Sequence, residues 1–252
     1  MRQVATSSKR TAWWSQVLTI AWLWWLYDAV SNLTRTRRER ALINGRWILR
    51  FEHAAHFDVE RALSGWTDKH RGIAVVVADF YDLAHLGVTF IALVALWWIA
   101  APAYRRQRNV LVLINVVGFL VFLVLPVAPP RMLPGFVDVI SQSHAIGSWH
   151  SGALGTVANE YAAMPSLHVA WAIWCAWALS TTCPFRWVRR ACVAHVLLTS
   201  IAVLATANHY VLDVVAGAST FAVCKITIER LAPILWRRTG PPLCRNRLIR
   251  SH

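Results

Sequence analysis

The sequence predicts an all-α polytopic membrane protein, with six transmembrane helices in a bundle and an amphipathic first loop. Hydrophobic residues make up 57% of the 252 residues. Several apolar runs reach the roughly 20 residues that a helix needs to cross a bilayer. The chain also has 15 tryptophans against three methionines, and many of the tryptophans stand in pairs at the ends of these runs. Tryptophan is enriched at the membrane–water interface, so this placement fits helix anchoring.

The first predicted unit, residues 1–72, combines an anchor helix with a basic loop. Its apolar run extends from Trp13 to about Ala29 and follows a short basic start. No small-residue cleavage site comes after the run, so we expect a retained anchor. The connection over residues 31–72 mixes basic, polar and apolar residues, which is typical of an amphipathic helix on the membrane surface.

The second unit, residues 73–231, contains the other five runs and is the predicted membrane core. Its first run, residues 73–101, includes Asp79, Asp82 and His85. Ionisable groups at membrane depth usually face a polar cavity or a partner. The remaining predicted runs are 110–127, 165–180, 191–208 and 209–225. Residues 232–252 form a basic tail, which we expect in the cytoplasm.

The charge distribution predicts partners and orientation. The net charge is +14, but the basic residues lie between and after the apolar runs and accompany no nucleic-acid motif. We therefore expect contact with anionic lipid head groups and no nucleic-acid partner. Most of the 26 lysines and arginines fall on the side of the two termini. The positive-inside rule then places both termini in the cytoplasm, as in a plasma-membrane protein, although the basic first loop opposes this orientation. The five cysteines lack the spacing of disulfides or zinc sites.

Polar residues converge on one face of the predicted bundle. Because the spans alternate in direction, the third ends, the fourth begins, the fifth ends and the sixth begins on the same face. Arg131 leaves the third run, His168 lies in the first turn of the fourth, and His209 opens the sixth. Asp213 follows His209 by four residues, which places the two on one helix face. We expect these four side chains to meet near one membrane surface.

The start of the fourth run, "MPSLHVAWA", has the features of an anion site. Pro165 suits the first helical position, where its missing N–H has no consequence. The N–H groups from Ser166 to His168 would then point at an anion such as phosphate. A histidine backed by a carboxylate is a nucleophile or base of fixed tautomer, and a second histidine can act as general acid. An arginine and a helix N-terminus stabilise charge on a transferring phosphoryl group.

Three ordered motifs resemble those of the type 2 phosphatidic acid phosphatase superfamily. "PPRMLP" is similar to its first motif, "PSLH" to its second and "HYVLD" to its third. The longer segments "PVAPPR", "MPSLH" and "NHYVLDVVAG", with "FYDLAH" before them, resemble most the inositolphosphotransferase branch, which contains inositol phosphorylceramide synthases. The resemblance covers roughly residues 75–225 and implies that residues 73–231 are a phosphatase-like catalytic core. It also implies a six-helix membrane bundle that needs no metal or other cofactor.

The resemblance also implies a role for each matching residue. His209 would be the nucleophile that forms a phosphohistidine, and Asp213 would orient it. His168 would protonate the leaving group, while Arg131 and Ser166 would hold phosphate oxygens. Possible pocket residues are Tyr81, His85 and Tyr210.

Departures from the family pattern favour one substrate class. The lipid phosphatase branch has a lysine where this chain has Val124 and an arginine where it has Val203, and Leu167 replaces a glycine. A pocket with fewer positive charges suits a phosphodiester better than a dianionic monoester, unless Arg50 or Arg61 folds in from the first loop. The sequence therefore predicts transfer of a phosphorylated head group, of inositolphosphate type, to a lipid alcohol.

Other functions stay open at this point. The same residues would serve a phosphatase acting on a lipid or isoprenoid phosphate, with water as the acceptor. A transporter could relay protons through the intramembrane carboxylates and histidines. A haem protein could use His168 and His209 as axial ligands, although none of the motifs predicts one.

Overall fold

The computed structural model describes residues 11–143 and 159–239, and these residues are almost entirely helical. Within these residues, one isolated β-bridge pairs Val127 with Ala162. The all-α prediction is therefore confirmed for the described part of the chain. Its α-helices are α1 (Trp13–Thr34), α2 (Arg38–Ala54), α3 (Glu60–Lys69), α4 (Arg71–Asp79), α5 (His85–Ile99), α6 (Ala101–Val124), α7 (Val139–Ser143), α9 (Leu167–Thr182), α10 (Arg186–Ala205) and α11 (Val211–Thr239).

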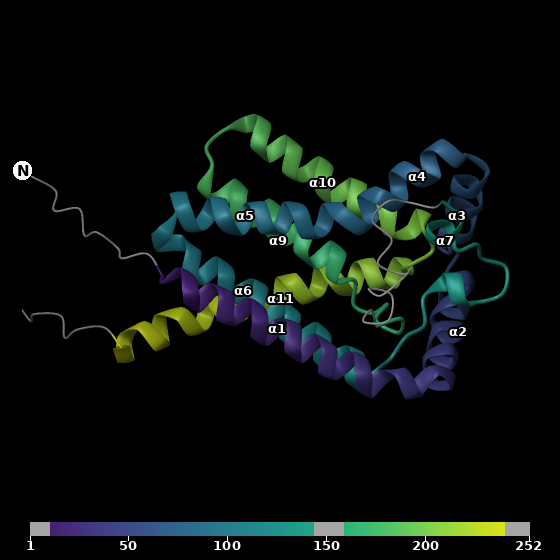
Figure 1. Ribbon diagram of the computed structural model, residues 1–252, viewed down its shortest axis with the longest axis horizontal. Helices are drawn as coiled ribbons and strands as arrows, with labels where there is room; N and C mark the ends of the chain where they lie inside the picture. The colour runs from purple at the N-terminus through teal and green to yellow at the C-terminus, as the bar shows by residue number, and fades with distance from the viewer. Residues whose placement is uncertain (1–10, 144–158, 240–252) are drawn as a thin grey trace, which may run out of the picture.

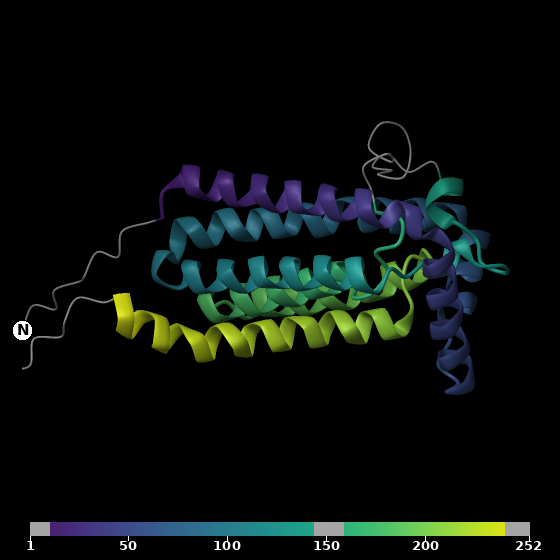
Figure 2. The ribbon, with the colours of Figure 1, turned by 90° about the horizontal axis from the view of Figure 1, so that it is seen from below.

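The long helices lie side by side, and the short ones gather at one end of them. Figures 1 and 2 show α1, α5, α6, α9, α10 and α11 running along the long axis of the molecule. Helices α2, α3 and α7 lie at one end, whereas α1 starts and α11 finishes at the other end (Figure 1). The end of α6, the start of α9 and the junction of α10 with α11 therefore meet beside α2 and α3. This is the convergence that the alternation of spans predicts.

Four helical segments within the described residues are long and apolar enough to cross a membrane. They are Arg71–Ile99, Ala103–Val124, Arg186–Ala205 and Val211–Leu231. These segments indicate an integral membrane protein. The predicted count of six is not confirmed: α9 has 16 residues, fewer than a span usually needs, and α1 has a polar C-terminal half-turn and many tryptophans.

The second predicted run is one continuous helical stretch with a local irregularity. Helix α4 passes into α5 through the π-helical segment η2 (Phe80–Ala84). The stretch from Arg71 to Ile99 is one of the four segments that are long and apolar enough to cross a membrane. Single π-helical turns inside α-helices are frequent at functional sites.

Glycines allow α6 and α11 to approach the start of α9. A Cβ on Gly118 of α6 would lie 2.7 Å from Leu167 Cδ2. A Cβ on Gly217 of α11 would lie 2.4 Å from the backbone oxygen of Ser166, far inside contact distance. Small residues permit such close helix approach in membranes.

Helix α2 lies across the end of the bundle, nearly perpendicular to the long helices (Figure 2). Its buried residues are Ala41, Gly45 and Glu52. Its exposed large residues are Ile43, Trp47 and Phe51, each at least half exposed. The large apolar side chains of α2 thus face outward, and a carboxyl group faces inward.

Candidate active site

Backbone pairing holds the first and second motifs together. The N–H of Val127 donates to the carbonyl of Tyr161 at 2.9 Å, and the N–H of Ala163 donates to the carbonyl of Val127 at 3.3 Å. The segment that leaves α6 is therefore fixed beside the segment that enters α9. Arg131 and His168 lie a few residues beyond this pairing.

His209 is buried just before α11 and has a fixed tautomer. Its Nδ1 lies 2.8 Å from the carbonyl oxygen of Ala163 and 3.4 Å from Oδ2 of Asp213. A carbonyl oxygen can only accept, so Nδ1 of His209 carries a hydrogen, and in the neutral ring the lone pair is on Nε2. Asp213 is fully buried, and its Oδ2 accepts the backbone N–H of Tyr210 at 2.9 Å. The arrangement engages Nδ1 and leaves Nε2 for the nucleophilic role that the sequence predicts.

His168 lies in the first turn of α9, against His209. The two imidazole rings are 5.5 Å apart between centroids, in an edge-to-face arrangement. His168 also stacks on Tyr81 at 4.4 Å and lies 4.2 Å from the ring of His85. The π-helical segment η2 and the start of α5 therefore place the two predicted pocket residues, Tyr81 and His85, directly beside His168. They line a crevice too narrow to admit a water molecule, together with His168, Phe80, Thr199, Ala202 and Val203.

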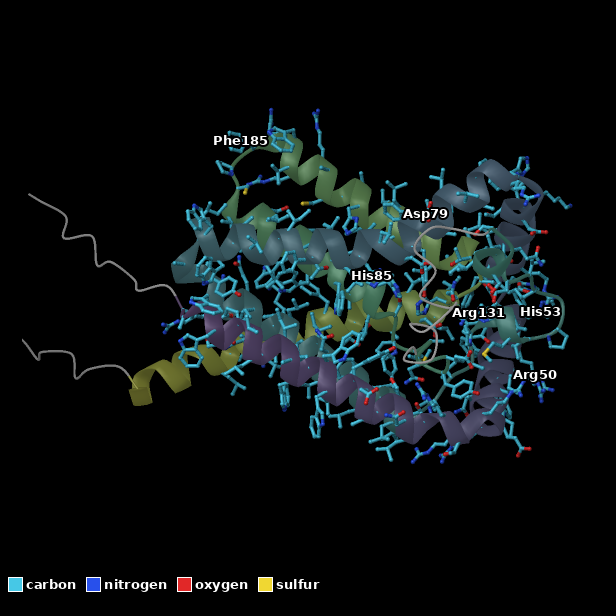
Figure 3. All side chains as sticks on the ribbon, viewed as in Figure 1. Arg50, His53, Asp79, His85, Arg131 and Phe185 are labelled. Carbon is cyan, nitrogen blue, oxygen red and sulfur yellow. The ribbon has the colours of Figure 1, made fainter. Side chains whose placement is uncertain are left out.

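Arg131 is held next to His209 by Ala207 and Asn208, the two residues that precede His209. The backbone N–H of Arg131 donates to the carbonyl of Ala207 at 2.8 Å, and its Nη1 donates to Oδ1 of Asn208. Its Nε lies 3.6 Å from Oδ2 of Asp138. Figure 3 shows Arg131 at the end of the bundle where α2 lies, and His85 within the bundle. Neither Asp138 nor Asn208, which is adjacent to His209, is among the residues predicted from the sequence.

Ser166 connects α9, which carries the predicted acid His168, to α11, which carries the predicted orienting carboxylate of Asp213. It is the N-cap of α9, and its hydroxyl accepts the N–H of Val169 at 3.5 Å. Its own N–H donates to the carbonyl of Asp213 at 3.0 Å. The expectation that Pro165 opens the helix and leaves the Ser166 N–H for an anion is wrong, because serine takes the cap position and α11 takes the N–H. A role of the Ser166 hydroxyl toward phosphate stays a prediction.

Tyr210 is a buried connection between the third and first motifs. It is completely buried, and its hydroxyl donates to the carbonyl of Ala128 at 3.0 Å. Sequence reasoning placed Tyr210 among possible pocket residues, but it does not line the crevice beside His168. Its packing neighbours include Val127, Leu133 and Ala163.

A family model identifies the superfamily. The model of the PAP2 superfamily matches residues 46–226, which is most of the chain. The chain belongs to the PAP2 superfamily. Members of this superfamily are generally phosphatases or phosphotransferases acting on lipid phosphates. No curated protein and no solved structure matches the chain.

The residues of the PAP2 motifs occupy one connected site. His168, His209, Asp213 and Arg131 come from the starts of α9 and α11 and the exit of α6, as the sequence predicts. In the parts of the chain that the structure describes, His, Cys, Asp and Glu form no group of three or more suited to a metal ion.

Proposed function

We propose that this PAP2 protein transfers a phosphorylated head group, of inositolphosphate type, from a phosphodiester lipid to a lipid alcohol through a phosphohistidine. The observation that carries the proposal is the arrangement of His209. Its Nδ1 is engaged by Ala163 and Asp213, which leaves Nε2 as the nucleophilic nitrogen. The ring of His168 stands beside it as a second proton-transferring group.

In the first half-reaction, Nε2 of His209 attacks the phosphorus and a P–N bond forms. The bond from phosphorus to the lipid oxygen breaks, and His168 in its imidazolium form donates a proton to that leaving oxygen. Asp213 stabilises the positive charge that develops on the ring of His209. Arg131 is placed to stabilise the charge on the non-bridging phosphate oxygens.

In the second half-reaction, the oxygen of an acceptor alcohol attacks the phosphohistidine. The neutral His168 takes the hydroxyl proton as the new P–O bond forms and the P–N bond breaks. His168 returns to its protonated form and His209 to its neutral form. General acid–base help of this kind contributes about 10²–10⁴-fold to the rate.

The charge around the phosphate position supports a diester substrate. Asp138 lies 3.6 Å from the guanidinium of Arg131 and offsets part of its charge. Val203, at one of the positions where the phosphatase branch carries a cation, is fully buried and packs near Tyr81 and Val169. Val124, at the other position, is 69% exposed. A phosphodiester carries one negative charge, which a single partly neutralised arginine can balance.

We also propose a membrane orientation. Helices α1 and α9 run beside the four apolar segments, so we infer six spans with both termini in the cytoplasm. The site then lies at the outer face of the plasma membrane, beside α2. The exposed Trp47 and Phe51 of α2 would sit in the lipid interface, where aromatic side chains are favoured.

A phosphatase is the second candidate, and Arg61 favours it. Nη1 of Arg61 lies 3.4 Å from the carbonyl oxygen of Gly135, and its guanidinium stands 4.5 Å from the ring of Phe136. The side chain thus reaches the loop that carries Arg131, as the sequence analysis allowed. A second cation there would suit a monoester of lipid or isoprenoid phosphate, with water as the acceptor.

The two reactions differ in donor and acceptor, so a product assay separates them. Purified protein would be given phosphatidylinositol or phosphatidic acid, each labelled at phosphorus, with and without an added lipid alcohol. Label moving from phosphatidylinositol to the alcohol supports head-group transfer. Inorganic phosphate released from phosphatidic acid, with no reaction of phosphatidylinositol, contradicts it and supports the phosphatase. Asp213→Asn is the control and should abolish either reaction while the protein stays folded.

A further inference from the structure

One face of α2 contacts both the first-motif segment and the third-motif segment. The carbonyl of Ala41 accepts the N–H of Ala128 at 3.0 Å, and the side-chain amide of Asn44 donates to the carbonyl of Pro126 at 2.8 Å. A Cβ on Gly45 would lie 2.6 Å from the oxygen of Ala128 and 2.8 Å from the hydroxyl of Tyr210. The inner face of α2 is therefore packed directly on the backbone around the candidate active site.

Glu52 continues this face and reaches the start of α11. Its Oε1 accepts the backbone N–H of Leu212 at 2.6 Å, across 160 positions of sequence. Glu52 is completely buried. The first N–H groups of a helix have no partner within the helix and are normally satisfied by a local cap. Here the acceptor comes from α2, and it binds the residue immediately before Asp213.

We propose that Glu52 is a positioning residue for the reaction. By capping α11 at Leu212, it fixes the first turn of that helix and so holds Asp213 in place against His209. The inference rests on the proposed function, and it makes the α2 segment of the first loop a part of the catalytic unit. The motifs that define the site do not include this segment.

The groups around Glu52 are acidic, and they determine its protonation state. Glu60 of α3 and Asp213 and Tyr210 at the start of α11 face it. Burial, together with the nearby charges of Glu60 and Asp213, raises the pKa of Glu52 to about 8. Burial also raises the pKa of Glu60. Glu52 therefore keeps a proton at neutral pH, and its Oε1 acts as a neutral acceptor for the Leu212 N–H. Ionisation would add a negative charge among these acidic groups.

The direct test compares Glu52→Ala with Glu52→Gln in the full-length protein. Glutamine retains a side-chain oxygen for the Leu212 N–H and resembles the protonated carboxyl, whereas alanine removes the acceptor. A misplacement of about 1 Å at a reacting group can lower a rate about 10²-fold, so we expect Glu52→Ala to lower kcat by about 10- to 100-fold. KM should change little, because Glu52 is not placed to touch substrate. Glu52→Gln should keep most of the parental kcat. If ionisation of Glu52 disturbs the site, kcat of the parent falls at alkaline pH, and this fall should be smaller in Glu52→Gln.

A pair of glycine variants tests the packing of α2 on the motif segments, on which the position of Glu52 depends, without removing a carboxyl. Gly45→Ala forces α2 away from Ala128 and Tyr210, whereas Gly65→Ala in α3 meets nothing within 4 Å. We expect Gly45→Ala to lower kcat and Gly65→Ala to match the parent. This pair decides the question if Glu52→Ala does not fold, as judged by circular dichroism and thermal melting in detergent.

The outcomes separate this inference from the proposed function. A parental kcat for folded Glu52→Ala, or for Gly45→Ala, would overturn the positioning role while leaving the reaction intact. Equal loss in Glu52→Gln and Glu52→Ala would also overturn it, because the acceptor would not be what matters. A parent protein that turns over neither lipid and forms no phosphohistidine would instead mean that the proposed function has failed.

Discussion

Replacing Gly217 by alanine should disable the site without touching a polar side chain. The new Cβ would lie 2.4 Å from the carbonyl oxygen of Ser166 and 3.5 Å from the backbone nitrogen of Ala170. Ordinary contact begins at 3.4 Å, so the start of α11 must move away from α9 by about 1 Å. Both obstacles are backbone atoms, which cannot rotate aside.

This shift has two measurable consequences. Overpacking at such a contact destabilises a protein by about 1–3 kcal/mol. The shift also lengthens the hydrogen bond of 3.0 Å from the N–H of Ser166 to the backbone carbonyl of Asp213. It moves His209 relative to His168. A displacement of about 1 Å in a catalytic constellation can lower kcat about 10²-fold. Thermal melting in detergent measures the first effect, and kcat on the lipid substrate measures the second.

Gly87→Ala is the matched control for this prediction. Gly87 lies in α5, and a Cβ there meets nothing within 4 Å. Alanine in place of a helical glycine stabilises by about 0.5–1 kcal/mol, so this variant should be at least as stable as the parent. If Gly217→Ala were as stable and as active as Gly87→Ala, the close approach of α11 to α9 would not be what aligns the site.

Three further predictions concern single groups. His168→Ala should slow turnover of natural lipids far more than turnover of an activated aryl phosphate ester, whose leaving oxygen needs no proton; equal loss on both would argue against His168 as the acid. Tyr210→Phe should destabilise the protein by about 1–3 kcal/mol in thermal or denaturant unfolding, because the buried carbonyl of Ala128 loses its donor; an unchanged stability would contradict the role of this hydroxyl. The pKa of Glu52 is raised from 4.5 to about 8 in the folded protein, so its contribution to stability is complete below about pH 4.5 and is lost as the pH rises through about 8. The melting temperature should fall over that interval, and Glu52→Gln should reduce the fall; identical profiles for the two proteins would refute this account of Glu52.

The arrangement of the site is predictable because it follows from the direction of the spans. The third run must end where the fourth begins, so Arg131 and His168 share a face whatever the detailed packing. The proximity of His209 and Asp213 is predictable for a different reason, because they are four residues apart. The structure confirms both, although His209 lies two residues before α11 and not inside it.

The partners of these side chains were harder to predict, because many of them are backbone groups. The carbonyl of Ala163, which binds Nδ1 of His209, has no sequence signature. The contact of Arg131 with Asp138 depends on how the loop after η3 (Pro130–Met132) folds back. Ser166 was placed at the wrong helical position, since the proline before it suggested an earlier helix start.

Helix α2 shows why an apolar pattern can mislead in a membrane protein. In a soluble helix, Trp47 and Phe51 would be expected inside and Glu52 outside. Here the apolar side chains are exposed on the molecule and Glu52 is buried against α11. In the proposed orientation α2 lies in the lipid interface, where large apolar groups need no burial within the protein. The inner face is then free to use small residues and hydrogen bonds.

The central claim is that His209 forms a covalent bond to phosphorus. The most direct measurement is to mix the purified protein with phosphatidylinositol labelled at phosphorus, quench in base and locate the label by mass spectrometry, with His209→Ala in parallel. The account predicts base-stable label on His209 in the parent, absent from His209→Ala, and lost when a lipid alcohol is added. Turnover without label on His209, or with His209→Ala as active as the parent, would contradict it.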